Sequence, residues 1–238
     1  MEIQVAIAKV ERTNPDGITD SFEAVERPNG GLSVIQASSH STSHSQISSA
    51  QTAVRRLANH LSTGVRDSAA ARAVSDSLFT EFQGRVECSA VTTSVDLASN
   101  TLVLCVNSNC PILLVEEGLI KRIDQAGTKL GAGRNIKPIV TEIPLAEDLL
   151  VIQFSEGVFE AGNEYGDKND LAITLQALLE DADPTLQELC DALIAQSVRL
   201  ERNRPANDLT VLALKVVGAA QSGFRKMNIT IPYLPFNP

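Results

Sequence analysis

The chain has 238 residues, a formal net charge of −9, 43% hydrophobic residues and 21% charged residues. This length and balance are typical of a globular protein with a full hydrophobic core, built as one domain or as one domain with a short appendage. The negative charge and the lack of a basic stripe argue against nucleic acid or an anionic membrane as a partner.

The chain shows no targeting or membrane-spanning segment. Its first ten residues alternate polar and apolar side chains and lack the basic start, apolar stretch and cleavage site of a signal peptide. No apolar run approaches the roughly 20 residues that span a bilayer. The cysteines include no CxxC pair, so we expect them to be reduced and mostly structural: Cys88, Cys105, Cys110 and Cys190. A cytoplasmic protein is therefore expected.

The N-terminal third predicts three strands followed by two helices. Short runs rich in Val, Ile and Phe are separated by turn-forming segments, which favours an antiparallel set of strands at 4–10, 21–26 and 32–37. Around Ser45 apolar residues begin to recur every three or four positions, which predicts an amphipathic helix that ends at Gly64. A second helical pattern runs from Ala70 to Phe82.

The rest of the chain returns to strands and then to a second pair of helices. A meander of hairpins is expected from the strands 89–96, 101–106, 112–116, 119–123, 137–143 and 148–154. Helices follow at 170–179 and 184–200, the second with Asp183 as N-cap and Pro184 at its first position, before a last strand at 209–217. This order predicts an α+β fold, in which two packed sheets carry helices on their outer faces.

The segment after Gly218 differs in texture from the rest of the chain. Its apolar run at 229–236 is broken by prolines and cannot form a central strand. We therefore interpret 1–217 as the domain and 218–238 as a C-terminal tail. The tail is expected to pack along the domain, and docking on another subunit to form an oligomer is the alternative.

Several phrases in this order are similar to those of one family. Residues 95–111 look like "DLxxGxLxxxNAGHPP", Lys129-Leu130-Gly131 resembles "PLG", residues 148–162 look like "DxLvLySDGvtEa", and residues 204–212 are similar to "DDxTvlvl". Together they resemble the PPM (protein phosphatase 2C-like) family, in its SpoIIE-like bacterial branch of sporulation and stress-response proteins. The resemblance extends to about Val217 and implies a four-layer α/β/β/α sandwich.

The resemblance also implies a reaction. Members of the family hydrolyse phosphoserine or phosphothreonine with a water molecule that bridges two Mn or Mg ions. Such ions lower the pKa of the water, orient it for in-line attack and offset charge on the phosphoryl oxygens. Hard divalent ions take oxygen ligands, so the site needs several carboxylates that converge from separate strand ends.

Two of the family's metal positions lie in the N-terminal strands. Asp20 matches the early aspartate before a strand, although a turn-capping aspartate is the alternative for this residue taken alone. The family's "aDGmGhG" corresponds to residues 37–43, so Ser38 stands at the bridging aspartate and Ser39 follows it. A neutral hydroxyl cannot hold two dications as a carboxylate does, and the loss of three glycines removes backbone freedom from this turn.

The other metal positions lie near the last strands. Glu156 stands where the family has aspartate and is one methylene longer, which matters because Mg sites tolerate little displacement of their ligands. Asn207 stands at a metal-binding aspartate and is followed by Asp208. A shift of one residue would make Asp208 the ligand, but adjacent strand residues face opposite sides. We therefore expect a degenerate metal site.

The segment that replaces the glycine-rich turn contains His40 and His44 among hydroxyl residues. A metal or nucleophile site is one interpretation, but no third ligand and no oriented base is apparent nearby. Capping of the following helix by Ser and Thr is the interpretation we favour, and anion binding at the helix N-terminus is a third.

The sequence thus supports two main hypotheses. The first is a phosphatase-like regulatory module with weak or no hydrolysis that binds a protein partner, phosphorylated or formerly phosphorylated, in bacterial signalling, with or without a metal ion. The second is an active Mn- or Mg-dependent phosphatase rebuilt around Asp20, Glu156 and Asp208. A weaker third is an oligomerisation role of the tail. The fold alone does not choose among them, because function resides in the site.

Overall fold

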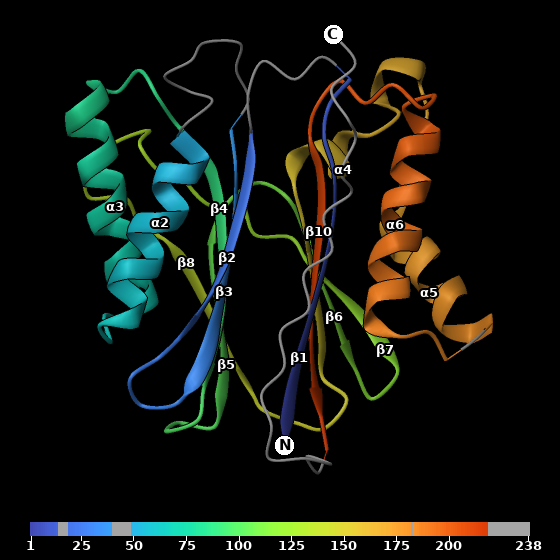
Figure 1. The fold of residues 1–238 in the computed structure, drawn as a ribbon, viewed down its shortest axis with the longest axis horizontal. Helices are drawn as coiled ribbons and strands as arrows, with labels where there is room; N and C mark the ends of the chain where they lie inside the picture. The colour runs from blue at the N-terminus through green and yellow to red at the C-terminus, as the bar shows by residue number, and fades with distance from the viewer. Residues whose placement is uncertain (14–18, 40–48, 182, 219–238) are drawn as a thin grey trace, which may run out of the picture.

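The computed structural model describes residues 1–13, 19–39, 49–181 and 183–218, and it confirms the α+β fold with two packed sheets (Figure 1). The first sheet has the order β1 (Glu2–Val10), β10 (Leu209–Val217), β9 (Leu150–Phe154), β6 (Ile112–Glu116) and β7 (Leu119–Ile123). The second has the order β2 (Asp20–Glu26), β3 (Gly31–Ser38), β4 (Ser89–Asp96), β5 (Thr101–Asn107) and β8 (Ile139–Pro144). All neighbouring strands are antiparallel.

Helices cover the outer faces of both sheets, which confirms the four-layer sandwich (Figure 1). The second sheet is covered by α2 (Ser49–Ser62) and α3 (Asp67–Phe82), and the first by α5 (Leu171–Asp181) and α6 (Leu186–Leu200). Two short elements that the sequence analysis did not predict follow β9, namely α4 (Glu156–Glu160) and the 3-10 helix η1 (Asn163–Tyr165).

Three hydrophobic cores separate the four layers, and strand periodicity explains how neighbouring residues enter different cores. In β3, Val34 faces the other sheet whereas Ile35 packs against α2 and α3. In β10, Leu212 faces the other sheet whereas Val211 packs under α5 and α6. Successive side chains of a strand point to opposite faces, so a strand that is buried on both sides is a continuous apolar run.

The prediction that the first three strands form one antiparallel set is wrong for β1. This strand pairs with β10 over its whole length, from Glu2 opposite Val217 to Val10 opposite Leu209. Its two faces are both apolar, since Ala6 and Ala8 enter the core under α6 while Ile3 and Val5 approach the core between the sheets. A strand of this kind fits the first sheet, next to the last strand of the domain.

The predicted meander is also wrong as a whole, although two of its hairpins are confirmed. Strands β4 and β5 pair directly, as do β6 and β7. The chain changes sheet between β5 and β6 and again between β7 and β8. Left-handed backbone at Asn100 and at Glu117 and Gly118 closes the two hairpins, as tight turns between twisted strands require.

The cap predicted for the last helix is wrong. The N-cap of α6 is Thr185, whose hydroxyl accepts the amide of Glu188 while the Glu188 carboxylate accepts the amide of Thr185. This reciprocal capping box satisfies two orphan backbone donors. It outweighs the Asp183–Pro184 pattern, and the helix begins at Leu186.

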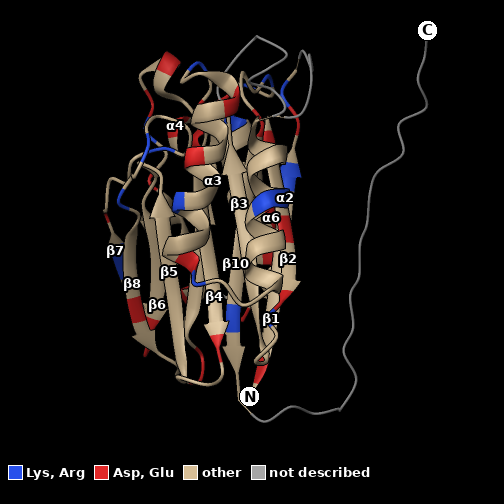
Figure 2. Cartoon of the chain, turned by 90° about the vertical axis from the view of Figure 1, so that its left-hand side faces the viewer, with Lys and Arg blue, Asp and Glu red and all other residues tan. Residues whose placement is uncertain are grey.

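All four cysteines are buried and unpaired. Within the described part of the chain, no helix combines the length and the apolar character that a membrane crossing needs. Basic and acidic residues are mixed over the side that carries α2 and α3, without a continuous basic stripe among the residues drawn in colour (Figure 2). Three predicted segments lie outside the described residues. They are the turn-forming segment at 14–17 between the first two predicted strands, the segment with His40 and His44, and the tail at 219–238.

Candidate functional site

The predicted site residues fall at one end of the sandwich, the upper end in Figure 1, beside α4. Asp20 opens β2 and lies opposite Ser38 at the end of β3, and Ser38 in turn lies opposite Ser89 at the start of β4. Glu156 is the first residue of α4, immediately after β9. Asp208 directly precedes β10. The strand register therefore aligns side chains that are up to 188 residues apart in the chain.

The carboxylate of Glu156 is bound by side chains of the protein itself. The ammonium Nζ of Lys129 lies 2.9 Å from Oε1 and 3.0 Å from Oε2, and the hydroxyl of Ser89 donates to Oε1. Glu156 is only 6% exposed. Desolvation lowers the pKa of Lys129, but the hydrogen bond and the charge of Glu156 outweigh it and leave that pKa raised. Glu156 and Lys129 thus form a partly buried ion pair.

Asp20 is held by hydroxyl groups, and no cation of the described residues contacts its carboxylate. Its side chain is 4% exposed, and Thr210 donates from Oγ1 to Oδ2 at 2.8 Å. Burial raises the pKa of Asp20 to about 6, against the lowering effect of hydrogen bonds from Thr210, Ser38 and Ser155. Desolvation disfavours the charged form of a carboxyl group that lacks a compensating cation.

Asp208 serves as an anchor for the N-terminal segment. Its Oδ1 accepts the backbone amide of Arg12 at 3.1 Å, and its Oδ2 accepts the amides of Thr19 at 3.1 Å and Asp20 at 3.2 Å. Lys9 Nζ lies 3.3 Å from Oδ2. Burial is the largest influence on the pKa of Asp208 and raises it, but these amides and Lys9 together leave it lowered. The side chain is committed to the chain segment that leads into β2.

Ser39 and Asn207 do not line the pocket that Glu156 lines. The amide and hydroxyl of Ser39 both donate to the carbonyl of Thr19, at 2.9 and 3.3 Å, so this residue closes the β2–β3 end. Asn207 lines a separate cavity of about 100 Å³ with Glu160 and Glu201. The backbone beside this cavity is closely packed, since a Cβ added at Gly157 would lie 2.3 Å from the carbonyl oxygen of Asp208.

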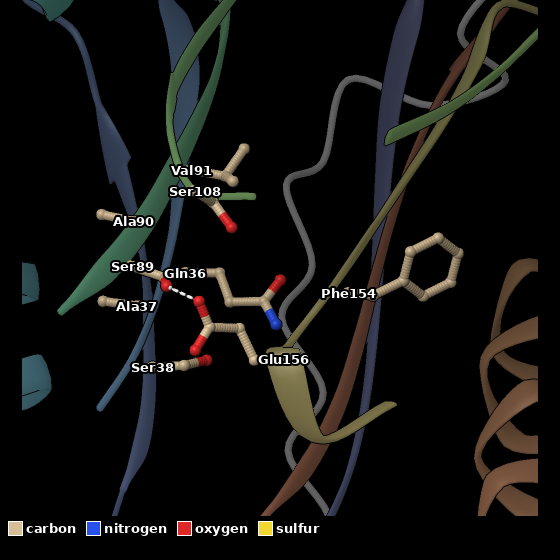
Figure 3. A pocket seen from close by; sticks show the side chains of 9 residues that line it. All are labelled: Gln36, Ala37, Ser38, Ser89, Ala90, Val91, Ser108, Phe154 and Glu156. Atoms are coloured by element: carbon tan, nitrogen blue, oxygen red, sulfur yellow. Dashed lines mark hydrogen bonds between the residues drawn. The ribbon is translucent and has the colours of Figure 1, made fainter. Parts of the chain in front are cut away.

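The space between Ser38 and Glu156 is a small pocket with both polar and apolar lining residues. Figure 3 shows Glu156 extending from α4 toward Ser38 and Ser89, while Phe154 points away from the pocket. Its volume of about 10 Å³ is close to the minimum that one water molecule needs. The full lining comprises Gln36, Ala37, Ser38, Ser89, Ala90, Val91, Ser108, Phe154 and Glu156.

Two glutamines lie between the sheets in this region. Gln36 donates from Nε2 to the carbonyl of Thr210 at 3.3 Å, and Gln153 accepts from Thr93 at 2.9 Å. Gln36 Oε1 and Gln153 Nε2 are buried atoms that have no hydrogen-bond partner among the residues that the structure describes. A buried polar atom of this kind is normally satisfied by ordered water, so the pocket suits a water molecule.

The described donors do not fit a pair of divalent metal ions. Ser38 offers a neutral hydroxyl, Glu156 is already paired with Lys129, and Asp208 is bound to backbone amides. Within the ranges that the structure describes, no three His, Cys, Asp or Glu side chains are grouped closely enough to hold a metal ion. Mn and Mg need several carboxylate oxygens that are free to coordinate them.

Sequence reasoning did not single out Lys129, Ser89, Thr210 or Gln36. Lys129 carried a signal, because it stands where the similar family segment "PLG" has an uncharged proline. Gln36 carried a weaker one, as a polar residue inside an apolar strand. Ser89 and Thr210 carried no sequence signal, since their partners are 67 and 190 residues away.

Comparisons with known proteins agree on the fold. The family model described as Stage II sporulation protein E (SpoIIE) matches residues 41–217. The solved PP2C phosphatase domain of SpoIIE from Bacillus subtilis, with a fragment of its regulatory domain, is 15% identical with a TM-score of 0.74, over 92% of this chain and 64% of that chain. The serine/threonine phosphatase Stp1 from Staphylococcus aureus is 10% identical with a TM-score of 0.73, over 92% and 96%.

A third similar structure contains the RsbU and RsbW domains of a Mycobacterium tuberculosis protein. It is 17% identical with a TM-score of 0.72, over 92% of this chain and 62% of that chain. No curated protein sequence matches the chain significantly. At these identities the structural matches support the four-layer fold, and the family model supports membership.

Proposed function

Because the chain belongs to the SpoIIE family of PP2C-type phosphatase domains, we propose that it is a catalytically impaired member that acts by binding a protein partner in bacterial signalling. The observation that carries this proposal is Ser38. It stands where the family has its metal-bridging aspartate, and it faces the pocket beside Glu156. A hydroxyl brings no negative charge to hold two dications together.

The surrounding carboxylates support the same conclusion. A metal ion at Glu156 would have to displace the ammonium of Lys129, and recruitment of Asp208 would break its hydrogen bonds with three backbone amides. Hydrogen bonds to charged groups contribute about 1.5–3 kcal/mol each. Rebuilding a two-metal site from Asp20, Glu156 and Asp208 would therefore remove several of the interactions that organise this end of the sandwich.

The kind of partner follows from the family and is part of the proposal. PP2C-type domains act on phosphoserine and phosphothreonine in proteins, so a protein with such a residue, phosphorylated or already dephosphorylated, is the partner we propose. The pocket of about 10 Å³ leaves space for a water molecule and not for a phosphoryl group. Recognition would therefore use the surface around the pocket, and the pocket itself would not receive the phosphoryl group.

Hydrolysis assays test the proposal. The purified chain is incubated with an aryl phosphate and with a phosphoserine peptide, with and without millimolar Mn, alongside a variant that carries Ser38→Asp, Ser39→Gly and Asn207→Asp. We expect no Mn-dependent turnover by the unmodified chain. Robust Mn-dependent turnover that Asp20→Asn abolishes would refute impairment and would support the rival hypothesis of an active phosphatase with a rebuilt site.

A further inference from the structure

We propose that Lys129 is an internal cation that takes the place of a metal ion at Glu156, so that this end of the sandwich is neutralised by the protein's own side chain and does not depend on a divalent ion. The proposal rests on the proposed function for the identity of the site, but it concerns metal dependence and not partner binding. Lys129 lies in none of the metal positions of the family, and it reaches Glu156 from the segment between β7 and β8.

The contact geometry suits a cation held by a carboxylate. Lys129 Nζ contacts both oxygens of Glu156, at 2.9 and 3.0 Å, and Ser89 donates to Oε1. An ammonium is a compact charge with three donors, so it can bind both oxygens of a carboxylate from one side. While the ammonium contacts both carboxylate oxygens of Glu156, a metal ion cannot occupy the same position.

The backbone holds Lys129 in place on both sides. Its neighbour Leu130 forms an isolated β-bridge with Cys88, with hydrogen bonds of 3.0 and 2.9 Å, and is fully buried. On the other side, the carbonyl of Thr128 accepts a hydrogen bond of 2.8 Å from the side chain of Asn107. The cation is therefore presented to Glu156 from a fixed position at the start of β4.

Burial separates this ion pair from the surface pairs of the same chain. The side chain of Glu156 is 8% exposed and that of Lys129 is 24% exposed, whereas in the pair of Lys121 with Glu116 the values are 56% and 31%. Surface pairs contribute little, but removal of one partner from a buried pair leaves a desolvated charge unbalanced and is strongly destabilising. The loss of Lys129 is thus expected to be felt through Glu156.

Thermal unfolding with and without Mn tests the proposal directly. The melting temperature of the unmodified chain is expected to be unchanged by millimolar Mn and by EDTA. In Lys129→Met it is expected to fall by on the order of 10 °C and to be partly restored by Mn, because the Glu156 carboxylate then loses the ammonium that contacts both of its oxygens. Lys121→Met is the matched control and is expected to change the melting temperature by about 2 °C or less.

A second variant separates charge from packing. Lys129→Met combined with Glu156→Gln removes both charges, so it is expected to recover most of the stability lost by Lys129→Met alone and to lose the response to Mn. If Lys129→Met does not fold, this double variant and the Mn response of the unmodified chain still decide the outcome.

Two results would refute the proposal that Lys129 takes the place of a metal ion at Glu156. One is a melting temperature of the unmodified chain that rises with Mn and falls with EDTA, and the other is a Lys129→Met variant no less stable than Lys121→Met. These outcomes are distinct from failure of the proposed function. If the chain hydrolyses phosphate and its melting temperature does not change with Mn, the proposal of catalytic impairment is refuted and the proposal of Lys129 as an internal cation stands. If Mn raises the melting temperature and no hydrolysis occurs, the proposal of an internal cation is refuted and that of impairment stands.

Discussion

Burial of Asp20 should make stability fall as the pH rises, and Asp20→Asn should remove this effect. Asp20 is 4% exposed, its carboxyl group receives hydroxyl donors and no cation from the described residues, and its pKa rises from 3.8 to about 6. The folded protein therefore binds this proton more tightly than the unfolded chain does. The stabilisation is fully present below pH 3.8 and is lost as the pH rises through about 6.

The size of the effect follows from the shift in pKa. A change from 3.8 to about 6 corresponds to about 3 kcal/mol between the two ends of this pH range. Asparagine has nearly the same shape and can accept the hydrogen bond of Thr210, but it carries no charge. Asp20→Asn is therefore expected to be more stable than the unmodified protein by about 2 kcal/mol at pH 8, and by much less at pH 4.

Urea unfolding between pH 4 and pH 8 measures this difference. Asp208→Asn is the matched control, because the pKa of Asp208 is lowered and its sign is opposite. The stabilisation by Asp208 is present above its ordinary pKa of 3.8 and is lost only as the pH falls through the lowered value, so Asp208→Asn should destabilise by a similar amount throughout pH 4–8. A free-energy difference for Asp20→Asn that does not vary with pH would refute the reasoning.

Two further predictions concern stability away from the site. Arg27→Met should reduce the free energy of unfolding by about 3 kcal/mol, since it leaves the buried Asp67 without the guanidinium at 2.9 Å, whereas Arg56→Met on the surface should cost under about 1 kcal/mol. Urea unfolding tests this, and equal losses in the two variants would contradict it. Gly131→Ala should be destabilising by about 1–3 kcal/mol, because φ is +84° and the new Cβ would lie 2.4 Å from a carbonyl oxygen. Gly133→Ala is the control, because a Cβ added at Gly133 would meet no described atom within 4 Å. Equal melting temperatures of Gly131→Ala and Gly133→Ala would show that the strain at Gly131 is absent.

Local patterns predicted most of the elements of the fold but not their partners. The period of the apolar residues indicated the strands and helices, and the expected neighbours β2 with β3 and β6 with β7 pair in the structure. The sheet to which each strand belongs was beyond this reasoning. Strand β1 is apolar on both faces and so resembles any strand of a two-sheet core, and only the partner at Leu209–Val217 decides its place.

The candidate site shows the same limit. Family phrases located Asp20, Ser38 and Glu156, which the structure places at one end of the sandwich. They did not indicate what neutralises Glu156, because the answer is a lysine 27 residues earlier whose side chain reaches it only in the folded chain. Asp208 was considered as a replacement ligand, and its bonds to the amides of Thr19 and Asp20 depend on a contact across 188 residues or more.

The position of β10 between β1 and β9 sets an order on synthesis at the ribosome. The second sheet is complete once β8 has emerged at Pro144, whereas β1 pairs in the described structure only with Leu209–Val217. At about 5–20 residues per second, the first strand waits roughly 10–40 s for its partner, with an unpaired apolar edge. A nascent chain that stalls before β10 would carry that edge and an uncovered sheet face, and would depend on chaperones until translation resumes.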